Sequence, residues 1–487
     1  MHEQQPASES SHGYPLSQLI GLLLGAGFLL MTVLLPPPES MTPEAWSALG
    51  LMLLMATWWS TEAIPIPATA LLPIVLVPGL GLGSISQATS PYAHPIIFLF
   101  LGGFTLGLAM QRWDLHRRIA LMTLKAVGNE PKRQIAGFML ATAFLSMWVS
   151  NTATAIMMLP IGLSVIGMMD NGQPENVQRY ATALLLAIAY SASVGGIATL
   201  IGTPPNALLA AYLSETQGVS VGFAQWMLLG VPVATVMLVL IWWWLTRQDF
   251  GLKSQEGAGE TIRDELKALG KMSRGEKLVA VVFVLTAGAW IFRPLLSANI
   301  MPWLTDTGIA ISAAIAMFII PVNVRKQTFV LDWDAAKEIP WGVLLLFGGG
   351  LAMAGVISSS GLASWIAASM GVASALPLIV MIMLVVAVII FLTEVTSNTA
   401  TTAAFLPLLG ALALSQELSP LLLTIPAAIA ASCAFMMPVA TPPNAIVFSS
   451  GHMKIGDMIG AGFALNIIGI VVVTLLCYLL MDFIFTI

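Results

Sequence analysis

Charged residues are scarce in this sequence, and their scarcity excludes most soluble folds. Of the 487 residues only 9% are charged and 57% are hydrophobic, whereas a soluble protein carries about 25% charged residues. So few charges cannot cover the surface of a soluble protein of this size, so lipid must surround most of the chain. Cysteine is almost absent as well. Cys433 and Cys477 lie far apart in apolar stretches, which excludes a disulfide framework and a cysteine metal site.

Apolar segments of spanning length recur along the chain without the alternation of a β-barrel, so they are predicted to be helices. A polar tail at 1–15 precedes a run at 16–35 that is predicted to be a retained first helix. The other predicted spans are 46–61, 66–80, 95–111, 179–201, 222–246, 277–293, 303–321, 340–357, 421–439 and 457–487. The predicted fold class is therefore an all-α integral membrane protein with about 11 transmembrane helices and two further re-entrant hairpins, described below.

Lys and Arg are missing from every second connection between these spans. Of the 19 basic residues, all except Arg293 are found in connections that fall on one side of the membrane if the spans alternate. Basic connections stay in the cytoplasm. The pattern predicts a protein of the cytoplasmic (inner) membrane with the N-terminus in the cytoplasm and the C-terminus on the outer side. The segment 247–276 is predicted to be a cytoplasmic linker.

Two segments fit this alternation only if they cross twice or return to the side they entered from. Residues 134–169 consist of two apolar arms separated by Ser150, Asn151 and Thr152. Each arm has about 16 residues, fewer than the ~20 needed to cross, and the three polar residues compete with helix hydrogen bonding. A re-entrant hairpin is therefore favoured, although two crossing helices would satisfy the same orientation. Residues 375–414 repeat this layout from the outer side.

The hairpin tips belong to an internal repeat. The sequence SNTAT begins at Ser150 and again at Ser397, 247 residues later. The sequence TPPNA begins at Thr203 and again at Thr441, 238 residues later. Matched landmarks in one order indicate a duplication, and the units 46–246 and 277–487 start on helices of opposite direction. The sequence therefore predicts inverted repeats, a layout of secondary transporters that places the substrate where the halves meet.

The paired prolines of each TPPN sequence remove backbone donors and exclude a continuous helix. They predict broken helices at 179–213 and 421–450. Unwound backbone at this depth is tolerated where it lines a cavity or is buried in protein. Its free carbonyls can coordinate a cation and its N–H groups attract an anion, while the SNT side chains add oxygen ligands suited to Na⁺. Bound sodium can then supply the positive field that no Lys or Arg provides.

Other interpretations remain open at single residues and for the whole chain. Glu394, three residues before the second SNT, is either a cation or proton partner or a hydrogen-bonding brace for the hairpin. An intramembrane enzyme could use Ser and Asn as nucleophile and oxyanion donor. That class is disfavoured because no His or Lys is found in the hairpin arms or the TPPN breaks to serve as a base. A passive channel is disfavoured because duplicated hairpins suit an occluded site.

The two SNT motifs, the two TPPN motifs and the Thr393-Glu394 pair resemble the divalent anion:sodium symporter family, the INDY-type di- and tricarboxylate carriers. The resemblance covers nearly the whole chain. It implies a first sodium site formed by Ser146, Ser150, Asn151 and Gly202. It implies a second sodium site formed by Thr393, Thr396 or Ser397, Asn398 and Ala440. The implied substrate ligands are Asn151, Thr152, Thr203, Asn398, Thr399, Thr441 and Pro442.

The resemblance further implies a homodimer in the lipid bilayer in which a transport domain moves as an elevator against a scaffold of the helices at 46–80 and 277–321. Na⁺ is the implied coupling ion, with no organic cofactor and no nucleic-acid partner. The leading hypothesis is a sodium-coupled symporter that imports C4-dicarboxylates such as succinate, malate or fumarate. The alternatives are a sodium-independent dicarboxylate exchanger and a carrier of another divalent anion such as sulfate.

Overall fold

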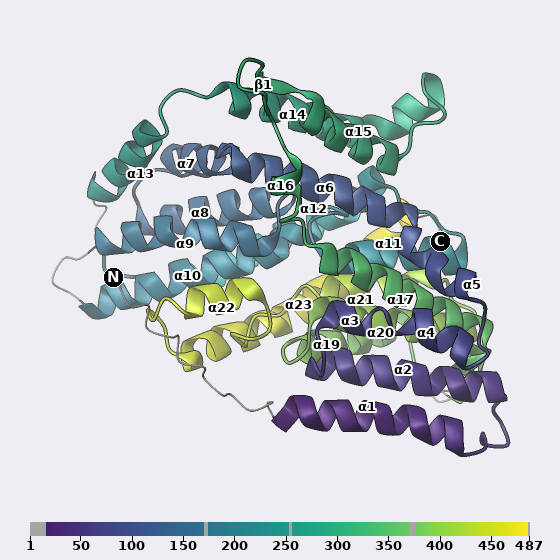
Figure 1. Ribbon diagram of the computed structural model, residues 1–487. Helices are drawn as coiled ribbons and strands as arrows, with labels where there is room; N and C mark the ends of the chain where they lie inside the picture. Colours follow the sequence, from purple (N-terminus) through teal and green to yellow (C-terminus); the bar gives the residue numbers. More distant parts are fainter. Residues whose placement is uncertain (1–15, 170–173, 253–255, 370–375, 486–487) are drawn as a thin grey trace, which may run out of the picture.

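The computed structural model describes residues 16–169, 174–252, 256–369 and 376–485, and these are almost entirely helical (Figure 1). In the first half of the chain the elements are α1 (Leu16–Leu34), α2 (Pro43–Thr61), α3 (Ile66–Thr69), α4 (Leu72–Gly79), α5 (Ile85–Thr89), η1 (Ser90–Ala93), α6 (Pro95–Arg112), α7 (Leu115–Val127), α8 (Pro131–Ser146), α9 (Asn151–Gly167), α10 (Pro174–Ile197), α11 (Pro204–Gln217) and α12 (Phe223–Thr246).

The linker contains α13 (Glu256–Ala268). In the second half the elements are α14 (Arg274–Asn299), α15 (Asp306–Ile319), β1 (Pro321–Asn323), β2 (Thr328–Phe329), α16 (Trp333–Ala336), α17 (Trp341–Ser359), α18 (Leu362–Ser369), α19 (Leu378–Thr393), α20 (Asn398–Ser415), α21 (Leu421–Ala430), α22 (Pro442–Phe448) and α23 (Ile455–Phe485). The two short strands pair antiparallel. Among the described residues, eight helices are long and apolar enough to cross a membrane.

Several shorter apolar helices accompany these eight, among them Ile66–Gly79, Asp306–Ile319 and Leu421–Ala430. They fall where the sequence predicts the spans 66–80, 303–321 and 421–439, so the all-α membrane fold is confirmed. The chain is also interrupted more often than predicted. The span at 66–80 is divided into α3 and α4 because Pro73 and the turn at Ala70 and Leu71 separate them.

Each SNT sequence lies at the point where one helix ends and the next begins. Ser150 caps α9 by accepting a hydrogen bond from the N–H of Ala153 at 3.2 Å, and Ser397 caps α20 through the N–H of Ala400 at 3.5 Å. The hydroxyl of a capping serine satisfies one of the N–H groups that lack a helical partner. The arms α8 and α19 have 16 residues each, about 24 Å at 1.5 Å per residue.

Each TPPN sequence also lies between two helices. Thr203 and Thr441 are extended, with φ of −146° and −140°, and the prolines that follow start α11 and α22. Proline is tolerated in the first turn of a helix because its missing N–H has no partner there anyway. The prolines thus begin a new helix after each break. They explain why α10 and α11 are separate helices, and why α21 and α22 are.

The broken helices are central in the molecule. In α10, 94% of the most apolar stretch is buried, and all residues of α21 are buried. Contacts around them are matched in the two halves: α11 packs on α20 and α21, while α22 packs on α9 and α10. Each half therefore places the short helix after its TPPN sequence against a helix of the other half's hairpin.

The outer helices show a second matched feature. The indole of Trp59 in α2 donates to the carbonyl of Ile66 at 3.3 Å, and the indole of Trp290 in α14 donates to the carbonyl of Asp306 at 3.0 Å. Ile66 and Asp306 are the first residues of α3 and α15. Each of these helix pairs contacts the other half of the chain: α17 packs on α3 and α4, and α6 packs on α15.

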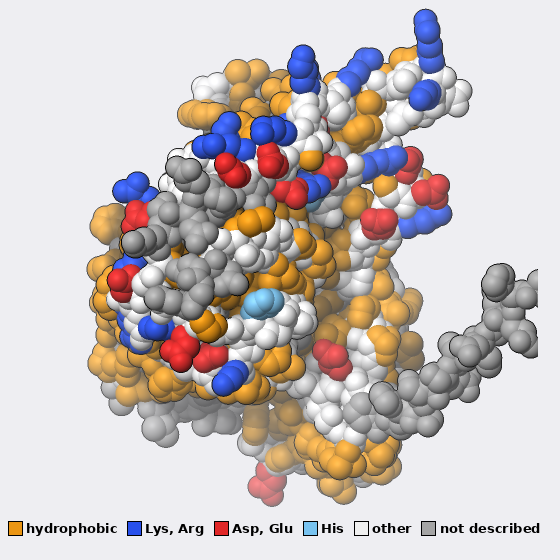
Figure 2. All heavy atoms as spheres, turned by 90° about the vertical axis from the view of Figure 1, so that its left-hand side faces the viewer, with side chains coloured by type: hydrophobic (Ala, Val, Ile, Leu, Met, Phe, Trp, Pro, Cys, Tyr) orange, Lys and Arg blue, Asp and Glu red, His pale blue; other side chains and the backbone are white. Residues whose placement is uncertain are grey.

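The linker at 247–276 contains a helix among its described residues. It includes α13, which packs on α7 and α9 because its apolar residues, such as buried Ile262, lie on one face. Glu265 of α13 forms an ion pair with Arg117. Arg118 of α7 forms a buried ion pair with Glu276 at 2.7 Å. Figure 2 shows Lys and Arg side chains spread over the upper part and left edge of this face of the molecule, with apolar side chains beside them.

Candidate substrate and sodium site

The first predicted sodium site is a compact cluster of oxygen atoms between the hairpin and the break in the following helix. Ser146 donates from Oγ to the carbonyl of Ala192 at 2.5 Å. One terminal atom of the Asn151 amide lies 2.5 Å from Ser146 Oγ, 3.1 Å from the Ala192 carbonyl oxygen and 3.2 Å from the Gly202 carbonyl oxygen. The structure therefore brings Ser146, Asn151 and Gly202 together, and it adds the carbonyl of Ala192.

The two orientations of the Asn151 amide give this cluster different chemistry. With the amide nitrogen inward, Asn151 donates to all three oxygens. With the amide oxygen inward, it accepts only from Ser146 Oγ and otherwise faces two carbonyl oxygens. Oxygens that face one another in this way repel unless a cation lies between them, and hard oxygen donors suit Na⁺. A rotation of one amide thus changes a hydrogen-bonded cluster into a ligand set.

The second predicted sodium site repeats part of this geometry. Thr393 takes the place of Ser146, and its Oγ1 lies within hydrogen-bonding distance of two acceptors, Asn398 Oδ1 at 2.5 Å and the carbonyl oxygen of Ala431 at 3.2 Å. Thr396, also predicted as a ligand, has its hydroxyl bonded within the hairpin to the carbonyl of Leu392 at 2.8 Å and to Thr401 Oγ1 at 2.6 Å. Ala440 closes a turn by donating from its N–H to the Met437 carbonyl at 3.2 Å.

The asparagine of each TPPN sequence holds the unwound segment that precedes it. Asn206 Nδ2 donates to the carbonyls of Gly196 at 3.2 Å and Thr199 at 2.8 Å. Asn444 Nδ2 donates to the carbonyls of Ala434 at 3.2 Å and Met437 at 3.1 Å. Every donor and acceptor in the second set lies 238 positions after its counterpart in the first. Both asparagines are fully buried, so these bonds fix the breaks from inside the protein.

Direct contacts join the two halves at the breaks. Thr203 Oγ1 lies 3.4 Å from Ser432 Oγ, and the Tyr190 hydroxyl donates to the carbonyl of Phe435 at 2.8 Å. Thr203 is a predicted substrate ligand, whereas Ser432 and Tyr190 are not among the predicted residues. Neither belongs to the SNT or TPPN sequences, so only their position in the fold reveals them.

The remaining predicted ligands lie at the hairpin tips and at the starts of the short helices. Ser150 is exposed, and Thr152, Ser397 and Thr399 are half-buried. Thr441 is buried and its Oγ1 accepts from the N–H of Asn444 at 3.3 Å, while Pro442 is exposed. The tips are thus partly accessible, whereas Ser146 and Thr393 behind them are fully buried. Thr203, by contrast, is 2% exposed.

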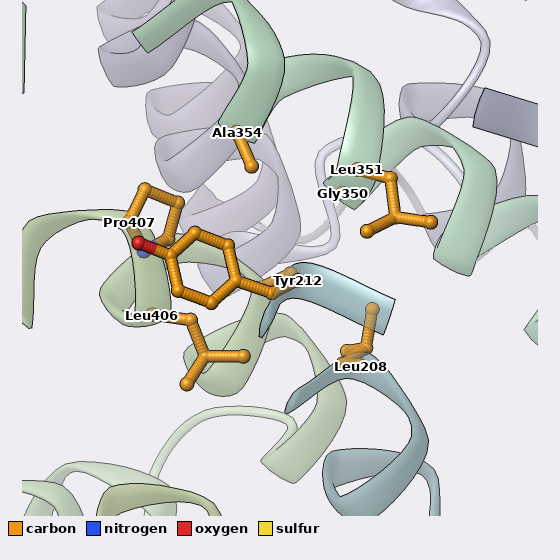
Figure 3. A pocket seen from close by; sticks show the side chains of 8 residues that line it. Leu208, Tyr212, Gly350, Leu351, Ala354, Leu406 and Pro407 are labelled. Atoms are coloured by element: carbon orange, nitrogen blue, oxygen red, sulfur yellow. The ribbon is translucent and has the colours of Figure 1, made fainter. Parts of the chain in front are cut away.

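A small cavity elsewhere in the molecule is not part of this site. It lies between α11, α17 and α20 and is lined by Leu208, Tyr212, Gly350, Leu351, Ala354, Ala403, Leu406 and Pro407 (Figure 3). Its lining is apolar apart from the Tyr212 hydroxyl, which lies beside Pro407. None of the predicted ligands lines it. The cavity is a packing gap between helices of the two halves.

Comparison with known proteins shows the family to which this chain belongs. A family model described as the sodium:sulfate symporter transmembrane region matches residues 16–487. A sodium-dependent dicarboxylate transporter of Staphylococcus saprophyticus is 42% identical over 97% of this chain and 93% of its own length. A protein of the same name from Staphylococcus aureus is 44% identical, again over 97% of this chain and 93% of its own length.

Two solved structures share the fold at much lower identity. MtrF of Neisseria gonorrhoeae, described as one of a class of antimetabolite efflux pumps, has a TM-score of 0.59 at 12% identity and covers 96% of this chain and 95% of its own. The YdaH transporter of Alcanivorax borkumensis has a TM-score of 0.59 at 14% identity and covers 96% and 99%. The resemblance inferred from the SNT and TPPN motifs is confirmed, and the chain belongs to the sodium:sulfate symporter family, that of the divalent anion:sodium symporters.

Proposed function

We propose that this protein is a sodium-coupled symporter that imports C4-dicarboxylates such as succinate, malate or fumarate. The observation that carries the proposal is the pair of matched oxygen clusters, one built on Ser146 and Asn151 and the other on Thr393 and Asn398. Each cluster lies beside an unwound helix and offers neutral hydroxyl, amide and carbonyl oxygens, the donors that Na⁺ accepts. The names of the relatives from the two staphylococci point to the same ion and substrate class.

The hairpin tips supply the complementary half of the chemistry. Helices α9 and α20 begin at Asn151 and Asn398, and a helix N-terminus attracts negative charge through its unpaired N–H groups and its dipole. Two such ends suit a molecule with two carboxylates. Sodium bound beside each tip adds positive charge close to the substrate, so anion and cations bind best together. This mutual dependence couples substrate movement to the sodium gradient.

The proposed architecture is a pair of inverted repeats, 46–246 and 277–487, with hairpins at 134–169 and 375–414 and broken helices at 179–213 and 421–450. Its support is the matched packing of α11 and α22 on the opposite hairpins and the matched tryptophan bonds of α2 and α14. The scaffold would comprise the helices at 46–80 and 277–321, and the hairpins and broken helices would move against it as an elevator. A homodimer, with the N-terminus in the cytoplasm, completes the proposal.

Uptake into proteoliposomes tests the transport claim. Purified protein is reconstituted, and accumulation of labelled succinate is measured with sodium or with potassium outside and a potassium interior. Labelled succinate is expected to accumulate against its own concentration gradient with sodium outside, and not with potassium outside. Equal uptake in both salts would contradict sodium coupling. Stimulation of sodium-independent uptake by unlabelled succinate inside the vesicles would identify a dicarboxylate exchanger instead.

Sulfate transport is the second candidate, because the matching family model is described by that anion. A hundredfold excess of unlabelled sulfate or of unlabelled succinate is added to the uptake assay. Succinate alone is expected to suppress the labelled signal, since two separated carboxylates match two helix N-termini better than one compact tetrahedral anion. Suppression by sulfate at equal concentration would favour the alternative.

A further inference from the structure

Glu394 is a buried carboxylate that belongs to neither predicted sodium-ligand set. It is 3% exposed. Its Oε1 accepts from the N–H of Phe435 at 2.7 Å, the N–H of Met436 at 2.9 Å and Asn466 Nδ2 at 2.8 Å. Its Oε2 accepts from the N–H groups of Met436 and Met437, both at 3.0 Å. Every one of these partners is a donor, so the geometry fits the ionised form, which only accepts.

These bonds hold an unwound segment. Helix α21 ends at Ala430 and α22 begins at Pro442, and buried backbone N–H groups between them need partners. Glu394 supplies the partner for three consecutive residues. The last of them, Met437, accepts at its carbonyl from the N–H of Ala440 at 3.2 Å. A short chain of bonds therefore runs from the carboxylate to Ala440, a predicted ligand of the second sodium site.

Thr393, the residue before Glu394, contacts the beginning of the same unwound segment between α21 and α22. The hydroxyl of Thr393 lies between two acceptors, the carbonyl of Ala431 directly after α21 and the side chain of Asn398 at the hairpin tip. Thr393 and Glu394 together attach both the start and the middle of the unwound segment to the end of α19. Two consecutive residues thereby connect the end of α19 to the segment that leads to Ala440.

In the first half, the break between α10 and α11 is held without a carboxylate. The position that corresponds to Glu394 is Met147, 247 residues earlier. Helix α10 continues to Ile197, whereas α21 ends at the position that corresponds to Ala192. The longer helix leaves fewer N–H groups unpaired, and Ala198 bonds locally to the Gly195 carbonyl at 3.1 Å. Thr199 Oγ1 then donates to the carbonyl of Met147 at 2.6 Å. The carboxylate is needed only where the helix ends early.

We propose that Glu394 is a positioning residue for the second sodium site, where its ionised carboxylate holds residues 435–437 unwound and thereby places Ala440 for sodium binding. The proposal rests on the sodium-coupled function proposed above and goes beyond it in assigning the two cation sites different supports. Glu394 touches neither substrate nor sodium in this role. This positioning role replaces the interpretation of Glu394 as a cation or proton partner, because the carboxylate oxygens of Glu394 already accept hydrogen bonds from amide donors.

The sodium dependence of succinate uptake tests this role. Glu394→Gln keeps the shape but turns an NH₂ group toward N–H donors, and Glu394→Asp keeps the charge but shortens the side chain. Both variants are expected to raise the sodium concentration for half-maximal uptake about tenfold, while the succinate KM at saturating sodium changes less than about threefold. Retained sodium affinity in Glu394→Asp together with loss in Glu394→Gln would mean that charge alone matters, and it would overturn the positioning role.

Glu276→Gln is the matched control, because it neutralises another buried carboxylate. Glu276 lies in the first turn of α14 and pairs with Arg118 at 2.7 Å. It is expected to lower thermal stability without changing the sodium dependence. A purely structural role of Glu394 would give the same result as this control, namely less folded protein with an unchanged half-maximal sodium concentration. That outcome would also overturn the proposal. Sodium-dependent thermal stabilisation of purified protein provides a readout independent of transport.

If Glu394→Gln does not yield folded protein, Asn466→Leu decides the question, since it removes one donor and leaves the carboxylate. Its half-maximal sodium concentration is expected to rise about threefold, and an unchanged value would refute the proposal. The wild-type protein separates this inference from the proposed function. Uptake by the wild type that ignores sodium defeats the symport itself, whereas sodium-dependent uptake that Glu394→Gln and Glu394→Asp leave unchanged defeats only the role of Glu394.

Discussion

The two hairpin tips carry the same SNT sequence but have opposite surroundings. Trp148, two residues before the first SNT, is 7% exposed, whereas Val395 at the corresponding position of the second tip is 65% exposed. In the breaks, Ile201 is 5% exposed and its counterpart Val439 is 78% exposed. The residues that flank the first tip and its break are therefore covered, and their counterparts beside the second tip and its break are exposed.

The cover over the first tip is aromatic. The ring of Trp148 lies 5.1 Å from that of Phe283, 6.1 Å from that of Phe223 and 6.4 Å from that of Trp290. Phe283 and Trp290 belong to α14 in the second half. The second hairpin contacts its surroundings differently, because its arm α20 packs on α2, α17 and α18. One hairpin thus touches the outer helices by its tip and the other along its arm. The two hairpins therefore differ in which part contacts the surrounding helices. Because their tip sequences are duplicated, this difference arises from the helices around them.

The largest expected effect tests whether the two tips form one site despite this difference. Asn151→Ala and Asn398→Ala each remove an amide from an oxygen cluster. Each variant is expected to lower sodium-dependent succinate uptake roughly a hundredfold, because hydrogen bonds to charged partners contribute about 1.5–3 kcal/mol each. Initial uptake rates in proteoliposomes, normalised to reconstituted protein, measure the loss. A variant that retains more than half of the wild-type rate would show that its tip does not belong to the site.

The aromatic cover gives the next largest effect. Trp148→Val introduces the residue of the second tip into the first and removes a large buried ring. The melting temperature of the purified protein is expected to fall by several degrees, because losing a buried aromatic side chain costs about 3 kcal/mol. The reciprocal change, Val395→Trp, places the larger ring in open space and should leave the melting temperature nearly unchanged. Equal destabilisation by both changes would mean that the second tip is as covered as the first.

Cysteine accessibility sharpens the comparison of the two breaks. Val439→Cys is expected to react with a hydrophilic maleimide at least about tenfold faster than Ile201→Cys, since a closed position must open by about 1.4 kcal/mol or more before it reacts. The natural thiols of Cys433 and Cys477 are buried, and unmodified protein measures their background. Labelling is followed by mass spectrometry of purified protein. A slow reaction at position 439 would show that this side chain faces lipid instead of water.

The smallest expected effect concerns the neutral support in the first break. Thr199→Val removes the hydroxyl that bonds to the Met147 carbonyl. The half-maximal sodium concentration is expected to rise about fivefold, in keeping with the ~1 kcal/mol of a neutral hydrogen bond. That is less than the tenfold expected for Glu394→Gln in the uptake assay. An equal or larger effect of Thr199→Val would reverse the ranking of the two breaks.

Sequence alone determined the main elements of this protein. Apolar length and scarce charge predict membrane helices, since lipid leaves the backbone no other partner for its polar groups. The SNT sequences at Ser150 and Ser397 predict where one helical arm ends and the next begins, because Ser, Asn and Thr compete locally with helix hydrogen bonding. The prolines of the TPPN sequences predict the breaks for an equally local reason. The family resemblance also follows from these motifs alone.

Tertiary structure decided what lies between the repeated sequences and around them. Ser432 and Tyr190 reach the site from outside the motifs, and Glu394 bonds to residues about forty positions later, which no local pattern specifies. The helix α13 within a charged linker depends on the face that α7 offers to it. The unequal cover of the two tips depends on where α14 lies. These features arise from packing between segments distant in the chain, and packing depends on the complete fold.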